Sequence, residues 1–321
     1  MPIDETLARY SDLSFETAFA VYLLALVLFV AEFAAVRVRR TTPAPVLVPA
    51  PAPAPAPEGP GRITEPTRRE MSDRLGRMGV SVLVVALILH IGSMVLRGLA
   101  TARFPWGNMY EFVTVTCAVG VLAGLIVLRR PELRVLWAFA LIPVLLLLFV
   151  AGTVLYADAA PVVPALQSFW LPIHVSIVSV SSGVFLVSGV ASTLFLLALR
   201  ADERPDSRVG RLMRRLPDAR VLDRLAYRTT IFAFPLFGAG VVLGAIWAEA
   251  AWGRFWGWDP KETVSFIAWV IYAAYLHARA TAGWRETRAA WINIAGFIAT
   301  LFNLFVINMV VSGLHSYAGL N

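Results

Sequence analysis

The chain has 321 residues, of which 58% are hydrophobic and 15% are charged, and its formal net charge is +7. Soluble domains are about 45–50% apolar, so this composition excludes an ordinary soluble enzyme and predicts an all-α integral membrane protein. The positive charge does not indicate nucleic-acid binding, because the cationic residues alternate with apolar runs. The single cysteine, Cys117, excludes both a CxxC dithiol reductase and a c-type cytochrome, which carries a CxxCH motif.

Eight apolar runs are long enough to form transmembrane helices, since about 20 helical residues cross the hydrocarbon core of a bilayer. The first 14 residues are acidic and do not resemble a cleaved signal peptide. In chain order, the expected helices are 15–36, 78–99, 109–128, 135–155, 173–199, 229–248, 263–280 and 291–312.

The connections between these runs alternate in charge. Of the 28 cationic residues, 23 lie in four alternating segments, which are 37–77, 129–134, 200–228 and 279–290. The positive-inside rule places such segments in the cytoplasm. The sequence therefore predicts both termini on the outer face. The excess of arginine over lysine, together with the high alanine content, is typical of a GC-rich bacterial genome, so we expect a bacterial cell membrane.

A Pro/Ala-rich tract at 43–60 divides the chain, and such tracts form extended, semi-rigid polyproline II segments. We expect an N-terminal accessory transmembrane helix in 1–42, although a plain membrane anchor is the simpler interpretation. A cytoplasmic Pro/Ala-rich and basic linker follows in 43–77. A seven-helix domain then occupies 78–321 and contains a tryptophan-rich outer loop at 249–262.

The four histidines fall into two groups. His90 and His277 lie inside expected helices, whereas His174 and His315 lie at outer helix ends. An ionisable ring inside a membrane is costly unless it is paired or ligated, and neutral imidazole is a frequent axial ligand of haem iron. One buried histidine is most often a hydrogen-bonded helix contact, but this pattern also favours two iron positions.

The outer loop at 249–262 concentrates the indole side chains of Trp252, Trp256 and Trp258. Such loops can belong to an interfacial aromatic belt. Flat indoles also offer a stacking surface for a macrocycle, and Gly253 would allow close approach of the backbone. Asp259 is expected to cap the following helix through a capping box.

A second outer segment carries Asn108, Tyr110 and Glu111 at the head of an apolar run. Polar groups at this position need partners. Helix capping is one explanation, and the other is that these residues shape the same outer cavity as the tryptophan-rich loop.

The segment WGRFWGWDPKE, residues 252–262, resembles the tryptophan-rich WWD signature of haem-handling proteins. Together with PWGNMYEF, HVS, YLHAR and GLHSY, it makes roughly residues 78–321 similar to the CcsA/ResC type of System II cytochrome c biogenesis protein, often labelled CcsB in actinobacteria. This resemblance implies that haem b is the cofactor, in one or two sites.

The resemblance also implies the haem ligands. His174 and His315 would hold iron at the outer face, and His90 and His277 would form an intramembrane haem site. The aromatic loop with Asp259 would line the outer haem.

The implied function is haem binding and delivery for covalent attachment to apocytochromes c. The implied partners are a ResB-type membrane protein, with which the chain would form a cytochrome c synthase, and the CxxCH segments of apocytochromes c. Thiol reductants of the same pathway would act indirectly. Whether this subunit is itself an enzyme stays open, because no side chain is an evident nucleophile. A haem exporter and a bis-histidine electron-transfer membrane protein are the alternatives.

Overall fold

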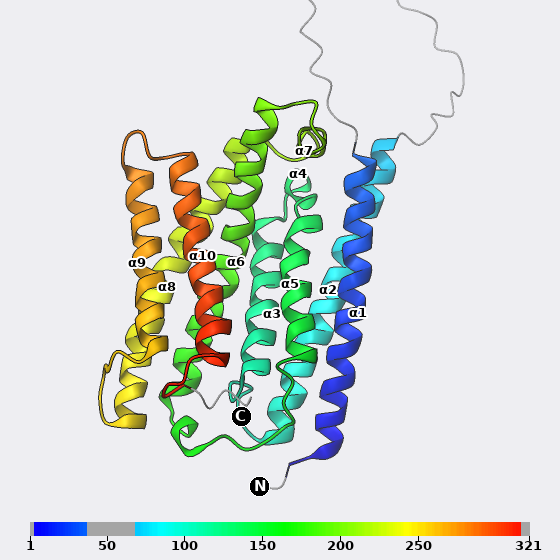
Figure 1. The fold of residues 1–321 in the computed structure, drawn as a ribbon. Coiled ribbons are helices and arrows are strands. Elements are labelled where there is room, and N and C mark those ends of the chain that lie inside the picture. The colour runs from blue at the N-terminus through cyan, green and yellow to red at the C-terminus, as the bar shows by residue number, and fades with distance from the viewer. Residues whose placement is uncertain (1–2, 37–67, 316–321) are drawn as a thin grey trace, which may run out of the picture.

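The computed structural model describes residues 3–36 and 68–315, and this part of the chain is helical without strands, which confirms the all-α fold class (Figure 1). Eight long helices form a bundle, and two short α-helices and a 3-10 turn lie in the connections. The elements are α1 (Glu5–Ala35), α2 (Arg68–Thr101), α3 (Met109–Val127), α4 (Pro131–Arg134), α5 (Trp137–Thr153), η1 (Pro164–Leu166), α6 (Trp170–Glu203), α7 (Arg208–Met213), α8 (Ala219–Trp252), α9 (Pro260–Ala280) and α10 (Thr287–Met309).

Each of the eight expected apolar runs coincides with one long helix. Within the described residues, six helices are long and apolar enough to cross a membrane, namely α1, α2, α3, α6, α8 and α10. The apolar helix α5 has only 17 residues, and α9 carries charged side chains at both of its ends. The chain is thus a multi-pass membrane protein, and the expected number of eight crossings stays a prediction for α5 and α9.

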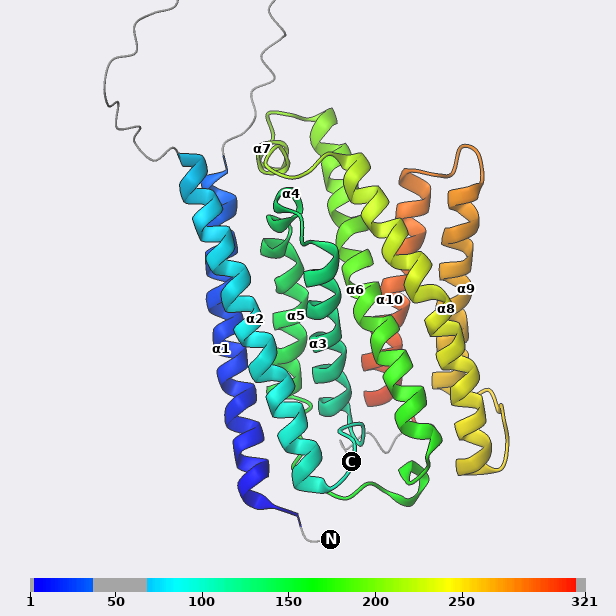
Figure 2. The same ribbon diagram turned by 180° about the vertical axis from the view of Figure 1, so that it is seen from behind.

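The two ends of the bundle differ in character. Helix α1 begins where α10 ends, and the α2–α3, α5–α6 and α8–α9 connections lie at the same end, which we call the pocket end (Figures 1 and 2). The arginine-rich segments 129–134, 200–228 and 279–290 lie around the opposite end, which we call the basic end. All described cation-rich connections are therefore on one side, as their alternation predicted.

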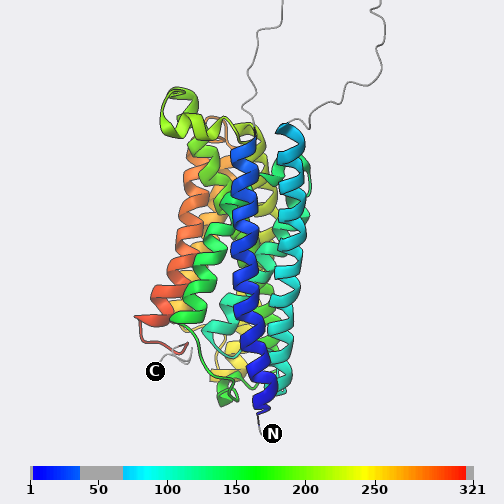
Figure 3. The same cartoon turned by 90° about the vertical axis from the view of Figure 1, so that its right-hand side faces the viewer.

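Helix α1 packs as part of the bundle core. Figure 3 shows it side by side with α2, and its Phe29 stacks on Trp137 of α5 with 6.1 Å between ring centroids. At the basic end, Glu32 of α1 accepts from Arg134 at 2.7 Å, and Arg134 also pairs with Asp73 of α2 at 2.9 Å. Apolar packing and the buried Glu32–Arg134 ion pair thus both connect α1 to its neighbours.

Residues 37–67, which include most of the expected linker, lie outside the described residues. The proposed division between an accessory segment 1–42 and a functional domain 78–321 stays a prediction.

A polar cluster joins the three helices α6, α8 and α10 inside the bundle. Asn293 of α10 donates to the hydroxyls of Ser188 at 2.8 Å and Ser192 at 2.7 Å, both in α6. Ser188 lies 2.6 Å from the hydroxyl of Thr230 in α8. Hydrogen bonds of this kind stabilise helix association in lipid, so the cluster holds together the helices whose ends form the cavity described next.

Candidate functional site

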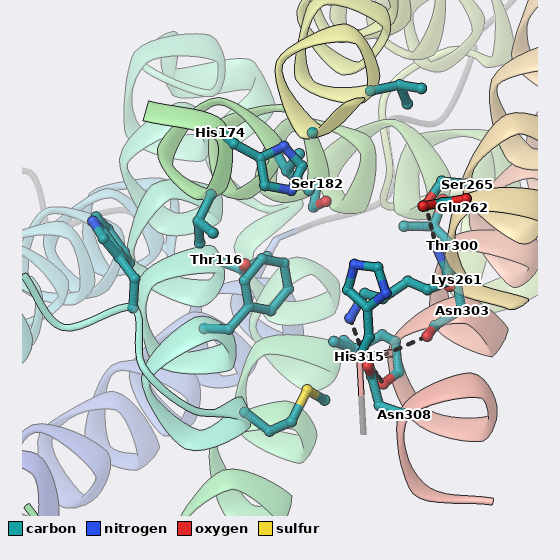
Figure 4. Close-up of a pocket in the computed structure, with 18 of the residues that line it drawn as sticks. Thr116, His174, Ser182, Lys261, Glu262, Ser265, Thr300, Asn303, Asn308 and His315 are labelled. Carbon is teal, nitrogen blue, oxygen red and sulfur yellow. Dashed lines mark hydrogen bonds between the residues drawn. The ribbon is translucent and has the colours of Figure 1, made fainter. Parts of the chain in front are cut away.

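A cavity lies at the pocket end, between the ends of α3, α6, α8, α9 and α10 (Figure 4). A mostly apolar cavity with a few convergent polar groups is typical of binding sites for organic ligands. The aromatic lining consists of Trp106, Phe112, Phe237, Trp247, Trp252, Trp256 and Phe297. The polar lining consists of Asn108, Thr116, His174, Ser182, Lys261, Glu262, Ser265, Thr300, Asn303, Asn308 and His315.

His174 enters this cavity from the first turns of α6. Its Nδ1 lies 2.8 Å from the carbonyl oxygen of Gly240 in α8. A carbonyl oxygen only accepts, so Nδ1 carries the proton and donates. In the neutral ring the lone pair is then on Nε2, which is the tautomer that a metal ligand requires.

The approach of α8 to this ring depends on a residue without a side chain. A Cβ atom at Gly244 would lie 2.7 Å from Cε1 of His174, closer than ordinary contact. Three residues farther along the helix, the indole of Trp247 stacks on the imidazole with 6.0 Å between centroids and 7° between planes. One face of α8 therefore sets both the tautomer and the tilt of His174.

His315 follows α10 and reaches the same cavity. Its Nδ1 lies 2.8 Å from Oδ2 of Asp259, and Oδ1 of the same carboxylate accepts from the backbone of Leu314 at 2.7 Å. Asp259 also accepts from the backbone of Lys261 and forms the expected capping box with Glu262. The capping prediction is confirmed, and the cap doubles as the anchor of the His315 segment.

The charge states of this pair follow from their surroundings. Burial acts to raise the pKa of Asp259, but the hydrogen bonds from His315 and Leu314 outweigh it and hold that pKa at about 2. Burial lowers the pKa of His315, although Asp259 opposes the shift. At neutral pH an ionised carboxylate therefore accepts from Nδ1–H of a neutral imidazole, which puts the lone pair on Nε2.

Trp247 lies at the centre of the aromatic wall. Its ring meets His315 edge-on at 5.7 Å and Trp252 at 4.8 Å, in addition to its stack on His174. Trp252 also meets His315 at 5.0 Å. Both histidines thus contact one indole, which brings them to the same site as expected.

The tryptophan-rich loop contributes only part of its aromatic residues to the cavity. Trp252 and Trp256 line it, whereas Trp258 does not and is 67% exposed. Gly253 ends α8 in the left-handed conformation at φ 71°, which a residue with a Cβ adopts at a cost. Its role here is to turn the chain out of the helix.

The three polar residues of the second outer segment, which were expected to cap a helix or shape the cavity, lie in different places. Asn108 lines the cavity and caps α3 by accepting from the backbone of Glu111 at 2.9 Å. Tyr110 is buried against Phe15 of α1 and does not line the cavity. The buried Glu111 lies behind the wall, where it pairs with Arg97 and Arg103 at 2.8 Å each.

His90 and His277 are not brought together. His90 is buried in α2 with its Nδ1 3.3 Å from the hydroxyl of Tyr22 in α1, whereas His277 is exposed on α9. Helices α2 and α9 lie at opposite edges of the bundle (Figures 1 and 2). This corrects the expected intramembrane haem site, because one iron cannot reach two rings that the bundle separates.

Sequence reasoning missed Trp247, Lys261 and Asn308 as lining residues. Trp247 lies near the end of the sixth apolar run and three residues after Gly244, so helical spacing puts both on one face. Lys261 is the only lysine in the chain. Both features are visible in the sequence. They indicate a cavity wall only when α6 and α10 are known to pack beside these residues.

Comparisons with known proteins match this chain to cytochrome c assembly proteins. The family model described as "Cytochrome C assembly protein" matches residues 106–315, which begins at Trp106 in the wall and ends at His315. The chain is 31% identical over 298 residues to the cytochrome c biogenesis protein CcsA of Gloeobacter violaceus, covering 77% of this chain and 88% of that protein. It is 34% identical over 242 residues to CcsA of Guillardia theta, covering 70% and 80%.

Among solved structures, the cytochrome c haem lyase CcmF superposes with a TM-score of 0.62 at 17% identity. The alignment covers 100% of this chain and 50% of that chain, so the present protein spans half the length of CcmF and shares its fold. Since the family model covers more than half of the chain and the CcsA relatives exceed 30% identity over most of their length, this chain belongs to the cytochrome c assembly protein family and is of the CcsA type.

Proposed function

We propose that this chain holds haem b between His174 and His315 and presents it for covalent attachment to c-type cytochromes, together with a ResB-type membrane protein. The family places the chain in cytochrome c biogenesis. The observation that carries the finer proposal is the pair of imidazoles in one cavity, each with its Nδ1 held by an acceptor.

The donor set fits haem better than a bare metal ion. Among residues 3–36 and 68–315, no group of three or more His, Cys, Asp or Glu side chains could hold a metal ion. Haem iron needs only two protein ligands, since the porphyrin supplies four nitrogens. Two imidazoles beside an indole wall therefore match the iron and the flat ring of haem.

The residues of the cavity would hold and orient the ligand. Trp247 and Trp252 would cover part of the macrocycle, while the acceptors behind His174 and His315 would keep both rings in the ligating tautomer. Bound haem supplies the vinyl groups, to which the CxxCH thiols of an apocytochrome c add. Fixing the orientation of one reactant before the other arrives is a large part of such catalysis, and the nucleophiles belong to the substrate.

The charge distribution supports one orientation in the membrane. We infer that all eight long helices cross the bilayer, with the basic end in the bacterial cytoplasm and the pocket end outside. The cavity would then open toward the compartment where c-type cytochromes mature.

Purification of the full chain in detergent, followed by an absorption spectrum, tests haem binding. We expect haem to co-purify, and His174→Ala or His315→Ala to reduce the haem-to-protein ratio. Arg9→Ala is the control, because this exposed side chain of α1 lies outside the cavity lining, and it should leave the ratio unchanged. Colourless but folded wild-type protein would rule out the proposal.

Maturation of a reporter cytochrome tests the step after binding. The gene would be supplied with that of its ResB-type partner to a host without cytochrome c maturation. Covalent haem staining of the reporter supports a synthase role. Haem-loaded protein without any staining would instead identify a haem exporter.

A further inference from the structure

Among the described residues, the side chain of Lys261 lines the cavity and forms no salt bridge, although Asp259 attracts it at longer range. Lys261, in the first turn of α9, donates from Nζ to Oδ1 of Asn308 at 2.6 Å (Figure 4). The nearby acids are engaged elsewhere, since Asp259 pairs with His315 at 2.8 Å and Glu262 with Arg254 at 3.5 Å. No salt bridge to Lys261 occurs within the described part of the chain.

This position is unfavourable for a cation in the absence of a ligand. The N-terminal turn of a helix carries partial positive charge, so a lysine there is repelled. An ammonium in a mostly apolar cavity also loses hydration, and the neutral amide of Asn308 offers one hydrogen bond but no countercharge. Lys261 is therefore placed where a ligand anion would be stabilised.

No arginine of the described residues lines the cavity. Arg97 and Arg103 are paired with Glu111 behind the wall, and Arg254 pairs with Glu262. Among the residues that the structure describes, Lys261 is the one cation that lines the cavity.

We propose that Lys261 binds a carboxylate of the ligand, and that, if the function proposed above holds, this carboxylate is a propionate of haem. Haem carries two propionates on one edge and its two vinyl groups toward the other side of the ring. A propionate fixed at Lys261 directs the vinyl groups away from α9. Lys261 thus determines which edge of the ring is presented to the substrate.

The test compares haem b with haem dimethyl ester, which has the same ring and iron but no carboxylates. Both are titrated into the full chain in detergent and followed by absorption. Wild-type protein should bind haem b at least tenfold more tightly than the diester. Lys261→Met should weaken haem b binding to the level of the diester and leave diester binding unchanged, which also shows that the variant has folded.

Two further variants test whether the preference for haem b depends on the positive charge of Lys261. Asn308→Asp keeps the lysine but places a carboxylate beside its Nζ, so it should remove the preference in the same way. Arg9→Met deletes an exposed cation of α1 at the same end of the bundle and should retain the full preference.

The outcomes separate this inference from the proposed function. If wild-type protein binds both compounds equally, or if Lys261→Met retains the preference, the role of Lys261 is refuted while haem binding stands. If neither compound binds the wild-type chain, the proposed function fails and this inference fails with it.

Discussion

Asp259 and His315 are hydrogen-bonded at 2.8 Å although 56 residues separate them in the chain. The carboxylate that accepts from this imidazole also starts α9 and accepts from the backbone of Leu314 at 2.7 Å. One side chain therefore fixes both a helix start and the ring of a proposed iron ligand. The two roles can be separated by substitution.

Asp259→Asn retains the cap, since asparagine is among the best N-cap residues, but it removes the charge that orients His315. We expect thermal stability in detergent close to that of the wild type, and haem affinity lower by about 10–100-fold, the usual effect of losing a partner behind a metal-ligating histidine. Asp259→Ala should lose haem and also about 1–2 kcal/mol of stability through the missing cap.

The measurements are thermal unfolding of the purified proteins and haem titration by absorption. A destabilised Asp259→Asn variant with normal haem affinity would contradict the assignment, because it would mean that the carboxylate serves the fold alone.

Gly244→Ala should disturb His174 specifically. The new Cβ would lie 2.7 Å from the ring, and the ring cannot move without losing either its hydrogen bond to Gly240 or its stack on Trp247. Overpacking of this kind costs about 1–3 kcal/mol, so we expect haem affinity to fall roughly ten- to hundredfold.

Gly92→Ala in α2 is the matched control for this substitution. No heavy atom lies within 4 Å of a Cβ at that position, and alanine favours helix more than glycine does. Haem titration of both variants decides the point, and equal affinities would show that the contact at Gly244 does not hold His174 in place.

The tryptophans of the loop are predicted to differ in importance. Trp252→Ala removes a ring that contacts His315 at 5.0 Å and lines the cavity, so haem retention should fall. Trp258→Ala removes a ring that is 67% exposed and lies outside the lining, so retention should stay near that of the wild type. The haem-to-protein ratio of the two purified variants measures this, and the reverse order would show that the bound state rearranges the loop.

Much of this architecture could be predicted because the signals are local. Hydropathy predicts where each long helix lies, and the alternating arginines predict which connections share an end. The capping box from Asp259 to Glu262 was also readable, since it depends on residues three positions apart. The same alternation of connections predicts that His174 and His315 lie at one end of the bundle.

The grouping of side chains across helices could not be obtained in this way. His90 and His277 both occur inside apolar runs, but one faces Tyr22 in the core and the other is exposed on an edge helix. Local sequence does not say which helices are neighbours. For the same reason, the sequence does not show that Trp247 stacks on His174 of α6.

The ion pairs behind the cavity wall are the basis of the last prediction. Glu111 is fully buried and accepts from Arg97 and Arg103, and its second oxygen accepts from the backbone of Gly107 at 2.6 Å. Arg103 also donates to the carbonyl of Ala160 in the α5–α6 connection at 2.9 Å. The network thus ties two pocket-end connections to α2 and α3.

Glu111→Gln leaves two arginines facing a neutral amide. Breaking one side of a buried pair typically costs about 3–5 kcal/mol, so we expect a clear loss of thermal stability in detergent. Haem retention should fall as well, because the Gly107 segment carries Asn108 into the cavity wall. Asp206→Asn, which breaks the exposed pair with Arg214 near the basic end, is the control and should change neither quantity, since surface pairs contribute little. A Glu111→Gln protein as stable as this control would mean that the buried pairs are no stronger than the exposed one.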